Sequence, residues 1–265
     1  PNDYDTHYNL ANVLSALQQY KKSKHHYQQA LTLNPLDPAT YCNFGSLLFS
    51  NAEIKSAIKI IKRAIEIDPT YITAHNNLLF CLNYSPDLSA EEIYKSYQEF
   101  DERFCIPLQS KWKPFTQPKE LKKRLKIGYV SPDFRNHSMV NFLKPTLENH
   151  NKDQFEVFAF AELEGEDQVT EQYKDYIDSW VPTKGLSDKA LAQKIRSLGI
   201  DILIDLAGHT NGSRLGAFMY KPAPVSLSWM GFGYTTGVSA IDYYLTDWTM
   251  APKGSEHLFT EKLWR

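Results

Sequence analysis

Prolines recur at a fixed interval of 34 residues near the start of the chain, at Pro1, Pro35 and Pro69. Apolar positions keep the same register in two sets, which are Leu10, Phe44, Leu78 and Leu14, Leu48, Leu82. Within each unit the apolar residues are three to four positions apart, which predicts two amphipathic helices. Because such a unit buries its apolar side only against its neighbours, the interval indicates a stack of helical repeats.

The period and pattern resemble tetratricopeptide repeats, which have the same length. We expect them over residues 1–84, as two complete units and the first helix of a third, at about 71–84. Asp37 before Pro38 predicts a helix cap followed by proline at the first helical position. Since about three repeats are needed for stability, further repeats are expected upstream, and a dimer through the repeats is compatible with the sequence.

Asn9, Asn43 and Asn77 occupy the same position of the first helix in successive units. A ladder of amides on the concave surface of such a superhelix could hydrogen-bond the backbone of an extended peptide. Alternatively, each amide satisfies neighbouring helices, because repeats also copy structural residues. Spacing alone leaves both interpretations open.

Residues 85–123 read as a helical extension and linker. The capping-box spacing of Ser89 and Glu92 predicts a helix to about Phe104, and a proline-rich stretch follows it. Trp112 and Phe115 indicate that the linker lies against a surface. The basic run at 119–126 reads as a solvated face, and the net charge of −2 gives no sign of a nucleic-acid partner.

From residue 124 to 265, short apolar runs alternate with helical patterns. Strands are expected at 125–130, 155–161, 200–206, 225–230 and 243–245, and helices at 139–148, 167–176, 187–198 and 213–220. Runs that are apolar on both faces, such as IDILIDL at 200–206, indicate a buried parallel sheet. The sequence therefore predicts a doubly wound α/β fold after the repeats.

Ligands of such sheets bind at the carboxyl ends of the strands, where this chain gathers glycine, hydroxyl and histidine residues. The candidates in these segments are His137, His209, Thr210, Thr235, Thr236 and Gly237. His137 could accept or position a hydroxyl proton, or could simply cap the next helix. His209 is a similar candidate in the next loop. Asp133 and Asp205 read as a loop cap and a strand-end partner.

The sequence lacks the motifs of several common kinds of binding site. The glycines at 231, 233 and 237 have the wrong spacing for a dinucleotide fingerprint, so a tight turn competes with a phosphate cradle. No metal-ligand spacing occurs, and the three cysteines are scattered. No apolar run reaches the length of about 18 residues that a membrane span needs. A reducing, cytoplasmic compartment is the expected location.

Five segments in this order resemble the bacterial form of the protein O-linked N-acetylglucosamine transferases. They are LKIGYVSPDFRNH at 125–137, DLAGHTNGSR at 205–214, KPAP at 221–224, WMGFGYTTG at 229–237 and DYYLTD at 242–247, preceded by PDLS at 86–89. The resemblance implies the N-terminal lobe of a metal-independent, inverting GT-B glycosyltransferase. The donor substrate would be UDP-GlcNAc, the acceptors would be serine or threonine hydroxyls of proteins, and no cofactor is needed.

By the same resemblance, His137 matches the active-site histidine of the family, a positioning residue, and the asparagine ladder matches the peptide-holding surface. Animal members carry tyrosine at the position of His209. An aspartate and a histidine of the family are replaced by Gln193 and Arg196, so their roles do not carry over. Gly233-Tyr234 stands where animal members have Pro-Gly.

The second, nucleotide-binding lobe is expected to be missing from this chain, which should then be inactive in isolation and bind UDP-GlcNAc weakly or not at all. Two alternatives stay open. One is a non-catalytic repeat scaffold for protein–protein interaction. The other is a fucosyl-transferring relative, because the absent lobe largely sets the choice of donor.

Overall fold

The fold was analysed in a computed structural model, which describes residues 3–115 and 124–265. The chain divides into two compact units, one up to Ile93 and the other from Tyr94 onward. The basic run at 119–126 begins outside the described residues.

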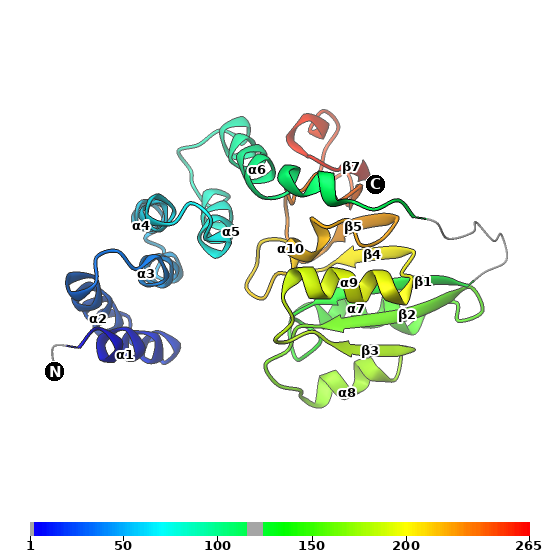
Figure 1. The fold of residues 1–265 in the computed structure, drawn as a ribbon, viewed down its shortest axis with the longest axis horizontal. Coiled ribbons are helices and arrows are strands. Elements are labelled where there is room, and N and C mark those ends of the chain that lie inside the picture. The colour runs from blue at the N-terminus through cyan, green and yellow to red at the C-terminus, as the bar shows by residue number, and fades with distance from the viewer. Residues whose placement is uncertain (1–2, 116–123) are drawn as a thin grey trace. The chain divides into compact units, whose positions relative to one another are not determined.

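Five helices form the first unit (Figure 1): α1 (Tyr4–Ala16), α2 (Tyr20–Leu33), α3 (Pro38–Ser50), α4 (Ile54–Ile67) and α5 (Ile72–Leu82). They pair as the 34-residue interval predicts. The carboxylate of Asp37 accepts the backbone N–H of Thr40 at 2.6 Å, and Pro38 is the first residue of α3. The predicted cap is thus confirmed.

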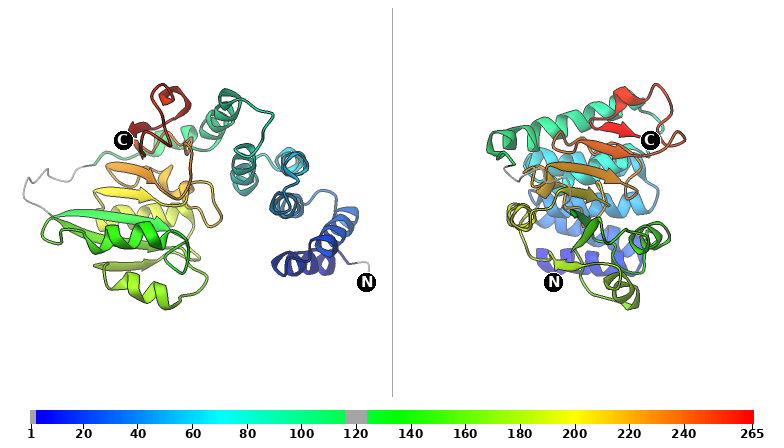
Figure 2. Two further views of the ribbon diagram at one scale, coloured as in Figure 1. Left: turned by 180° about the vertical axis from the view of Figure 1, so that it is seen from behind. Right: turned by 90° about the vertical axis from the view of Figure 1, so that its right-hand side faces the viewer.

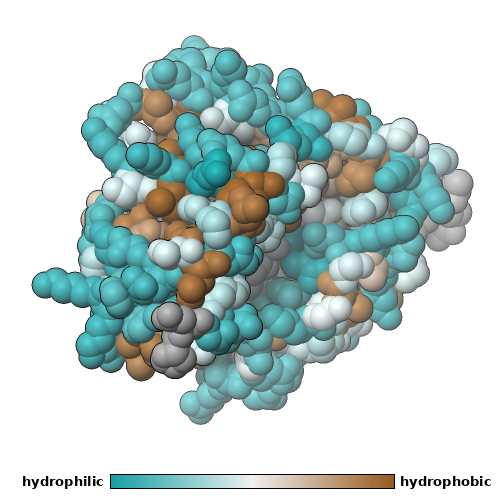
Figure 3. Space-filling view, turned by 60° about the vertical axis from the view of Figure 1, so that its left-hand side comes forward, coloured by the Kyte–Doolittle hydropathy of each residue, from teal (hydrophilic) through white to brown (hydrophobic). Residues whose placement is uncertain are grey.

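The repeat core is built from the apolar positions that keep the 34-residue register. Phe44 packs on Tyr27 with ring centroids 5.7 Å apart, and Ile61 is fully buried beside them. Apolar side chains also reach the largely polar surface, where they appear as brown patches in Figure 3. In α1, Leu10, Val13 and Leu17 are exposed.

A further helix begins at the position that the sequence indicates and includes the division at Ile93 between the two units. α6 (Ala90–Phe104) is preceded by Ser89, whose backbone N–H donates to the Glu92 carboxylate at 2.8 Å. In return the Glu92 backbone N–H donates to the Ser89 hydroxyl at 3.2 Å, which completes the capping box. The short helix η1 (Ile106–Lys111) follows, and the half-buried indole of Trp112 donates to the Met219 carbonyl at 2.8 Å.

Seven parallel strands then form one sheet in the order β3-β2-β1-β4-β5-β6-β7. The strands are β1 (Leu125–Ser131), β2 (Phe155–Ala161), β3 (Ser179–Pro182), β4 (Ile202–Asp205), β5 (Val225–Trp229), β6 (Tyr243–Leu245) and β7 (Lys262–Trp264). The helices between them are α7 (Val140–Glu148), α8 (Gln168–Lys174), α9 (Asp188–Leu198) and α10 (Leu215–Phe218). Figures 1 and 2 show α7 and α9 on opposite faces of the sheet. The predicted doubly wound fold is confirmed.

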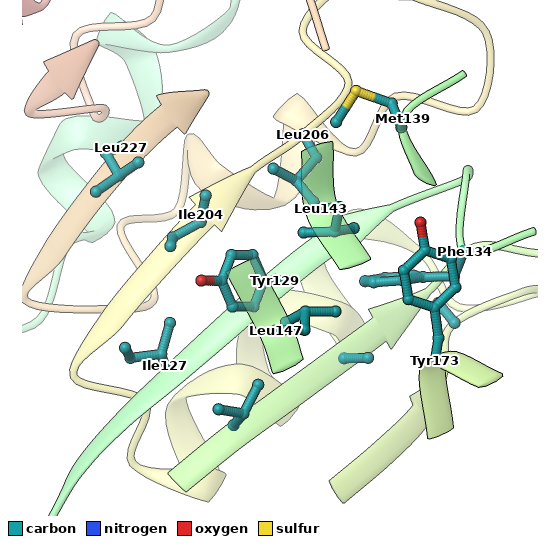
Figure 4. Packing of buried hydrophobic residues seen from close by; sticks show 13 residues of the cluster. Ile127, Tyr129, Phe134, Met139, Leu143, Leu147, Tyr173, Ile204, Leu206 and Leu227 are labelled. Atoms are coloured by element: carbon teal, nitrogen blue, oxygen red, sulfur yellow. The ribbon is translucent and has the colours of Figure 1, made fainter. Parts of the chain in front are cut away.

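The core on the α7 face joins the central strands to α7 and α8. Figure 4 shows Leu143 and Leu147 of α7 beside Tyr129 of β1, with Ile204 of β4 on the other side of the tyrosine ring. At the carboxyl end of β1 the ring of Phe134 meets Tyr173 edge-on, with centroids 5.6 Å apart. This packing extends the core to the edge of the sheet where the loops begin.

Sequence reasoning missed two strands and overestimated some lengths. β3 and β7 have four and three residues, which is too short to show a periodic pattern. The helix expected at 213–220 shrinks to Leu215–Phe218 because Arg214 leaves the helical conformation. The buried Arg214 side chain instead pairs with Glu162 at 2.6 Å and Asp188 at 2.9 Å.

Candidate functional site

The sheet has one position where neighbouring strands are followed by connections that run in opposite directions. β1 leads outward to β2 and β3, and the chain then returns to place β4 on the other side of β1. Such a switch point opens a crevice at the carboxyl ends of the two strands, which is where ligands of open α/β sheets bind. The loops that hold His137 and Thr210 follow these two strands.

The two loops contact each other directly. Gly212 has a φ of +79°, and a Cβ at this position would lie 2.7 Å from Cβ of Pro132. A larger residue would therefore push the loop after β4 away from the loop after β1. The close approach brings together two segments that the sequence separates by about 75 residues.

The loop after β1 is held rigidly below its exposed end. Phe134 is fully buried, and its carbonyl oxygen accepts the Thr170 hydroxyl at 2.8 Å. The backbone N–H of Asn136 donates to the carboxylate of Asp167 at 2.8 Å. Asp167 also caps α8, so that helix and loop share one anchor. His137 therefore projects from a fixed backbone.

His137 itself is half-exposed, with 38% of its side chain accessible. Its Nδ1 accepts the backbone N–H of Met139 at 3.4 Å and lies 3.8 Å from the Asp133 carboxylate. With Nδ1 as an acceptor, the proton of the neutral ring belongs on Nε2. In this tautomer Nε2 donates a hydrogen bond to a ligand rather than removing a proton, which suits a positioning role.

The loop after β5 presents the opposite arrangement, because Thr235 and Thr236 are fully buried. Thr235 donates its hydroxyl to Glu261 Oε2 at 2.6 Å, and the Thr236 backbone N–H donates to Glu261 Oε1 at 2.8 Å. The Thr236 hydroxyl also donates to Glu261. Burial raises the pKa of Glu261, while the threonine hydrogen bonds oppose that shift. Both hydroxyls are thus committed inside the protein.

Glu261 was not identified from the sequence. Its partners lie 25 and 26 residues earlier, so no local spacing marks it. A buried carboxylate that accepts three hydrogen bonds fixes the shape of the loop it supports.

His209 is also buried, and its Nε2 donates to the Thr236 carbonyl oxygen at 2.7 Å. The rings of Tyr97, Phe100 and Phe232 meet it edge-on, with centroids 5.0–5.4 Å away. Burial lowers the pKa of His209 from 6.5 to about 4, so the ring is neutral near pH 7. In this position His209 ties the loop after β4 to the loop after β5.

Helix α6 supports the same loop from outside the sheet. Gly237 has a φ of +60°, and a Cβ there would lie 2.8 Å from Cβ of Tyr97. The carboxylate of Asp101, one turn further along α6, accepts the backbone N–H of Ser239 at 2.8 Å. The helix that the sequence places before the sheet is therefore part of the packing around residues 235–239.

The remaining strand-end candidates make internal contacts. Asp205 is buried and accepts the N–H of Gly208 at 2.9 Å and the Ser228 hydroxyl at 2.7 Å, which is the strand-end role expected for it. Burial raises its pKa. Thr210 is half-buried and donates its hydroxyl to the Ala207 carbonyl at 2.8 Å.

The asparagine ladder links successive repeats. Asn43 Nδ2 donates to Tyr8 Oη at 2.9 Å and to Asn12 Oδ1 at 3.1 Å. At the equivalent position, Asn77 Nδ2 donates to Cys42 Sγ at 3.1 Å and Ser46 Oγ at 3.0 Å. The amide N–H groups of Asn43 and Asn77 thus form hydrogen bonds from the first helix of one repeat to the first helix of the preceding repeat. The carbonyl oxygens keep their capacity to accept.

Asn9, in the first repeat, is exposed.

Among residues 3–115 and 124–265 no three histidine, cysteine, aspartate or glutamate side chains are grouped so that they could hold a metal ion. In the same part of the chain, no helix is long and apolar enough to cross a membrane.

The fold defines a protein of helical repeats followed by a doubly wound α/β lobe. Residues 95–264, more than half of the chain, match the model of glycosyl transferase family 41. The chain belongs to this family. Residues 4–36 and 38–71 match models of the tetratricopeptide repeat, as their period predicts.

Individual relatives agree with this assignment. A rice protein named "Probable UDP-N-acetylglucosamine--peptide N-acetylglucosaminyltransferase SPINDLY" is 31% identical over 212 residues, which are 78% of this chain and 23% of the relative. An Arabidopsis thaliana protein is named "Probable UDP-N-acetylglucosamine--peptide N-acetylglucosaminyltransferase SEC". It is 36% identical over 170 residues, which are 61% of this chain and 17% of that protein.

Among solved structures, a mutant O-GlcNAc transferase of Thermobaculum terrenum superposes with a TM-score of 0.94 and 30% identity. The match covers 100% of this chain and 51% of that one. The chain thus spans about half the length of this solved relative and about a fifth of the plant proteins.

Proposed function

We propose that the protein to which this chain belongs transfers N-acetylglucosamine from UDP-GlcNAc to serine or threonine hydroxyls of proteins, with inversion. The observation that carries the proposal is a half-exposed histidine on a rigid loop at the switch point of a family 41 lobe. The names of the plant and bacterial relatives supply the reaction class and the sugar. In this proposal the chain contributes the repeats and the acceptor-side lobe.

His137 is the residue that we place against the reacting groups. Its Nε2–H would donate a hydrogen bond to an oxygen of the acceptor or of the sugar, while the backbone N–H of Met139 keeps the ring in orientation. Such positioning converts a random encounter into a geometry close to that of the transition state. The expected contribution of a group of this kind is on the order of 10²-fold in rate.

Thr210, Thr235, Thr236 and Gly237 are proposed to shape the substrate side of the crevice. Since the hydroxyls of Thr235 and Thr236 are occupied by Glu261, these two residues would act through their backbone and through the loop shape. The buried His209 would act on substrate only indirectly, through the Thr236 carbonyl that it holds.

The repeats are proposed to bind the acceptor protein. Asn43 and Asn77 keep a carbonyl oxygen that could accept from the backbone N–H groups of an extended peptide, and Asn9 is an exposed residue. Recognition through backbone groups tolerates many acceptor sequences.

The experiment is a transfer assay on the full-length protein with UDP-GlcNAc and a serine-containing peptide, read by mass spectrometry. We expect one N-acetylhexosamine on the peptide and none on a peptide whose serine is replaced by alanine. A parallel assay with an activated fucose donor tests the alternative that the enzyme transfers fucose. Transfer of fucose alone would replace the proposed sugar, and absence of transfer from either donor would reject the enzymatic function.

A further inference from the structure

A groove of about 350 Å³ lies along α9, away from the switch point. Its lining residues are Lys111, Lys113, Lys189, Ala192, Gln193, Arg196, Tyr220 and Pro222. Four of them are cationic and none is acidic, although the chain as a whole has a net charge of −2. The charged side chains that line this concave surface are therefore all positive.

The three lysines of the groove lack carboxylate partners in the part of the chain that the structure describes. No carboxylate lies within ion-pair distance of Lys111, Lys113 or Lys189 there. By contrast, Lys126, Lys152 and Lys221 of the same unit are each paired with an aspartate or glutamate. Like charges that converge without counter-charges repel one another, and an anion would relieve this repulsion.

Arg196 shows that the groove has a built wall. Its Nη2 donates to the carbonyl oxygens of Lys113 at 2.8 Å and Pro114 at 2.6 Å, and its guanidinium stacks on Phe115 with Cζ 4.3 Å from the ring centroid. These contacts fasten the segment that carries Lys113 to the side of α9. Lys113 and Lys189 therefore face a common space instead of separate stretches of surface.

The position separates this groove from the site described above. Arg196 stands near the end of α9, shortly before β4 begins, and Pro222 stands shortly before β5. His137 follows the carboxyl end of β1, at the other end of the parallel strands. The groove thus runs along α9 from Lys189, at the start of the helix, toward the amino ends of the strands, and its lining residues do not belong to the two switch-point loops after β1 and β4.

We propose that this groove binds a small polyanion with two or more linked phosphates. Lysine and arginine are the side chains that bind phosphate in proteins, the former as a point charge and the latter through planar N–H groups. Three lysines, with the charge of the structural Arg196 beside them, match the charge of a diphosphate or triphosphate better than that of a single carboxylate. The volume of about 350 Å³ is within the range of small-molecule sites, and Tyr220 and Gln193 add polar groups at the wall.

The test is isothermal titration of the chain with inorganic diphosphate at low ionic strength. We expect saturable binding with a Kd of about 1 mM or tighter that weakens as salt is added. The variants Lys113→Ala and Lys189→Ala should each weaken binding by about threefold or more, because each removes one of the converging charges. Lys253→Ala, an exposed lysine outside the groove, is the matched control and should leave the Kd unchanged.

Adenosine diphosphate then distinguishes the source of the linked phosphates. Binding about tenfold tighter than that of inorganic diphosphate would identify the phosphate tail of a nucleotide, since the base then adds contacts. Equal affinities would identify the phosphate chain alone. The proposal is wrong if no saturable binding occurs up to about 10 mM, or if Lys253→Ala weakens binding as much as the two groove variants, whose folding is verified by circular dichroism.

Discussion

The loop after β1 and the loop after β5 end at the same edge of one sheet, yet they use their polar side chains in opposite ways. The first buries Phe134 and leaves His137 half-exposed. The second buries Thr235 and Thr236 and turns their hydroxyls toward Glu261. A polar residue at a strand end is therefore a candidate for ligand contact only when no internal partner takes its hydrogen bonds.

The largest expected effect comes from removing the support of the second loop. Glu261→Ala leaves two buried hydroxyls and one backbone N–H without their acceptor, and each such group costs about 1–3 kcal/mol. We expect the free energy of unfolding to fall by about 4 kcal/mol in urea denaturation. Glu256→Ala, which removes a half-exposed carboxylate that pairs with Arg265, should cost much less than Glu261→Ala. Equal losses in the two variants would mean that the loop does not depend on Glu261.

The next effect is a pH dependence that arises from His209. Burial lowers its pKa from 6.5 to about 4, so the unfolded chain takes up a proton at a pH where the folded chain does not. The contribution of His209 to the free energy of unfolding is fully present above pH 6.5. It is lost as the pH falls toward about 4, and the total loss is about 3 kcal/mol.

Burial raises the pKa values of Asp205 and Glu261, so these two groups make the folded protein more stable, not less stable, as the pH falls. The contribution of His209 is therefore measured as the difference between the wild type and His209→Gln, whose amide can still donate to the Thr236 carbonyl. The same pH profile in both proteins would show that His209 is not held neutral by burial.

A similar contrast exists within the repeats, between Asn43 and Asn9. Asn43→Ala removes two hydrogen bonds to the preceding repeat, and we expect a loss of about 1 kcal/mol in the free energy of unfolding. Asn9→Ala, at an exposed position, should change it by less than about 0.3 kcal/mol. Chemical denaturation of both variants measures the difference, and a peptide-binding assay shows separately whether either amide contacts an acceptor. Equal stability losses would remove the structural role assigned to Asn43.

The smallest effect on stability is expected at His137. The side chain is half-exposed and its one hydrogen bond is long, so His137→Ala should change the free energy of unfolding by less than about 0.5 kcal/mol. Thermal denaturation checks this expectation. A larger loss would show that His137 supports the loop, as Glu261 supports the other one.

Much of the fold could be predicted because its signals are local and repeated. The 34-residue interval identified the helical pairs, and runs apolar on both faces identified the central parallel strands. β3 and β7 were missed because three or four residues show no period, and their place depends on pairing with β2 and β6.

The site could be predicted only in part, for a physical reason. Strand-end position identified the loops of His137 and Thr235, but burial depends on contacts between distant segments. Glu261, 25 residues beyond Thr236, and Tyr97 on α6 supply those contacts, and nothing in their own surroundings marks them. A sequence can therefore indicate which loops gather at an edge before it indicates which side chains remain free there.

The central claim is that His137 acts on substrate while the loop after β5 provides support. Its most direct test is the transfer rate of the full-length protein with His137→Ala, beside His257→Ala as a control at an exposed histidine away from the switch point. We predict a fall in kcat/KM of about 10²-fold or more for the first variant and no change for the second. A rate within about threefold of the wild type for His137→Ala would contradict the role assigned to this histidine.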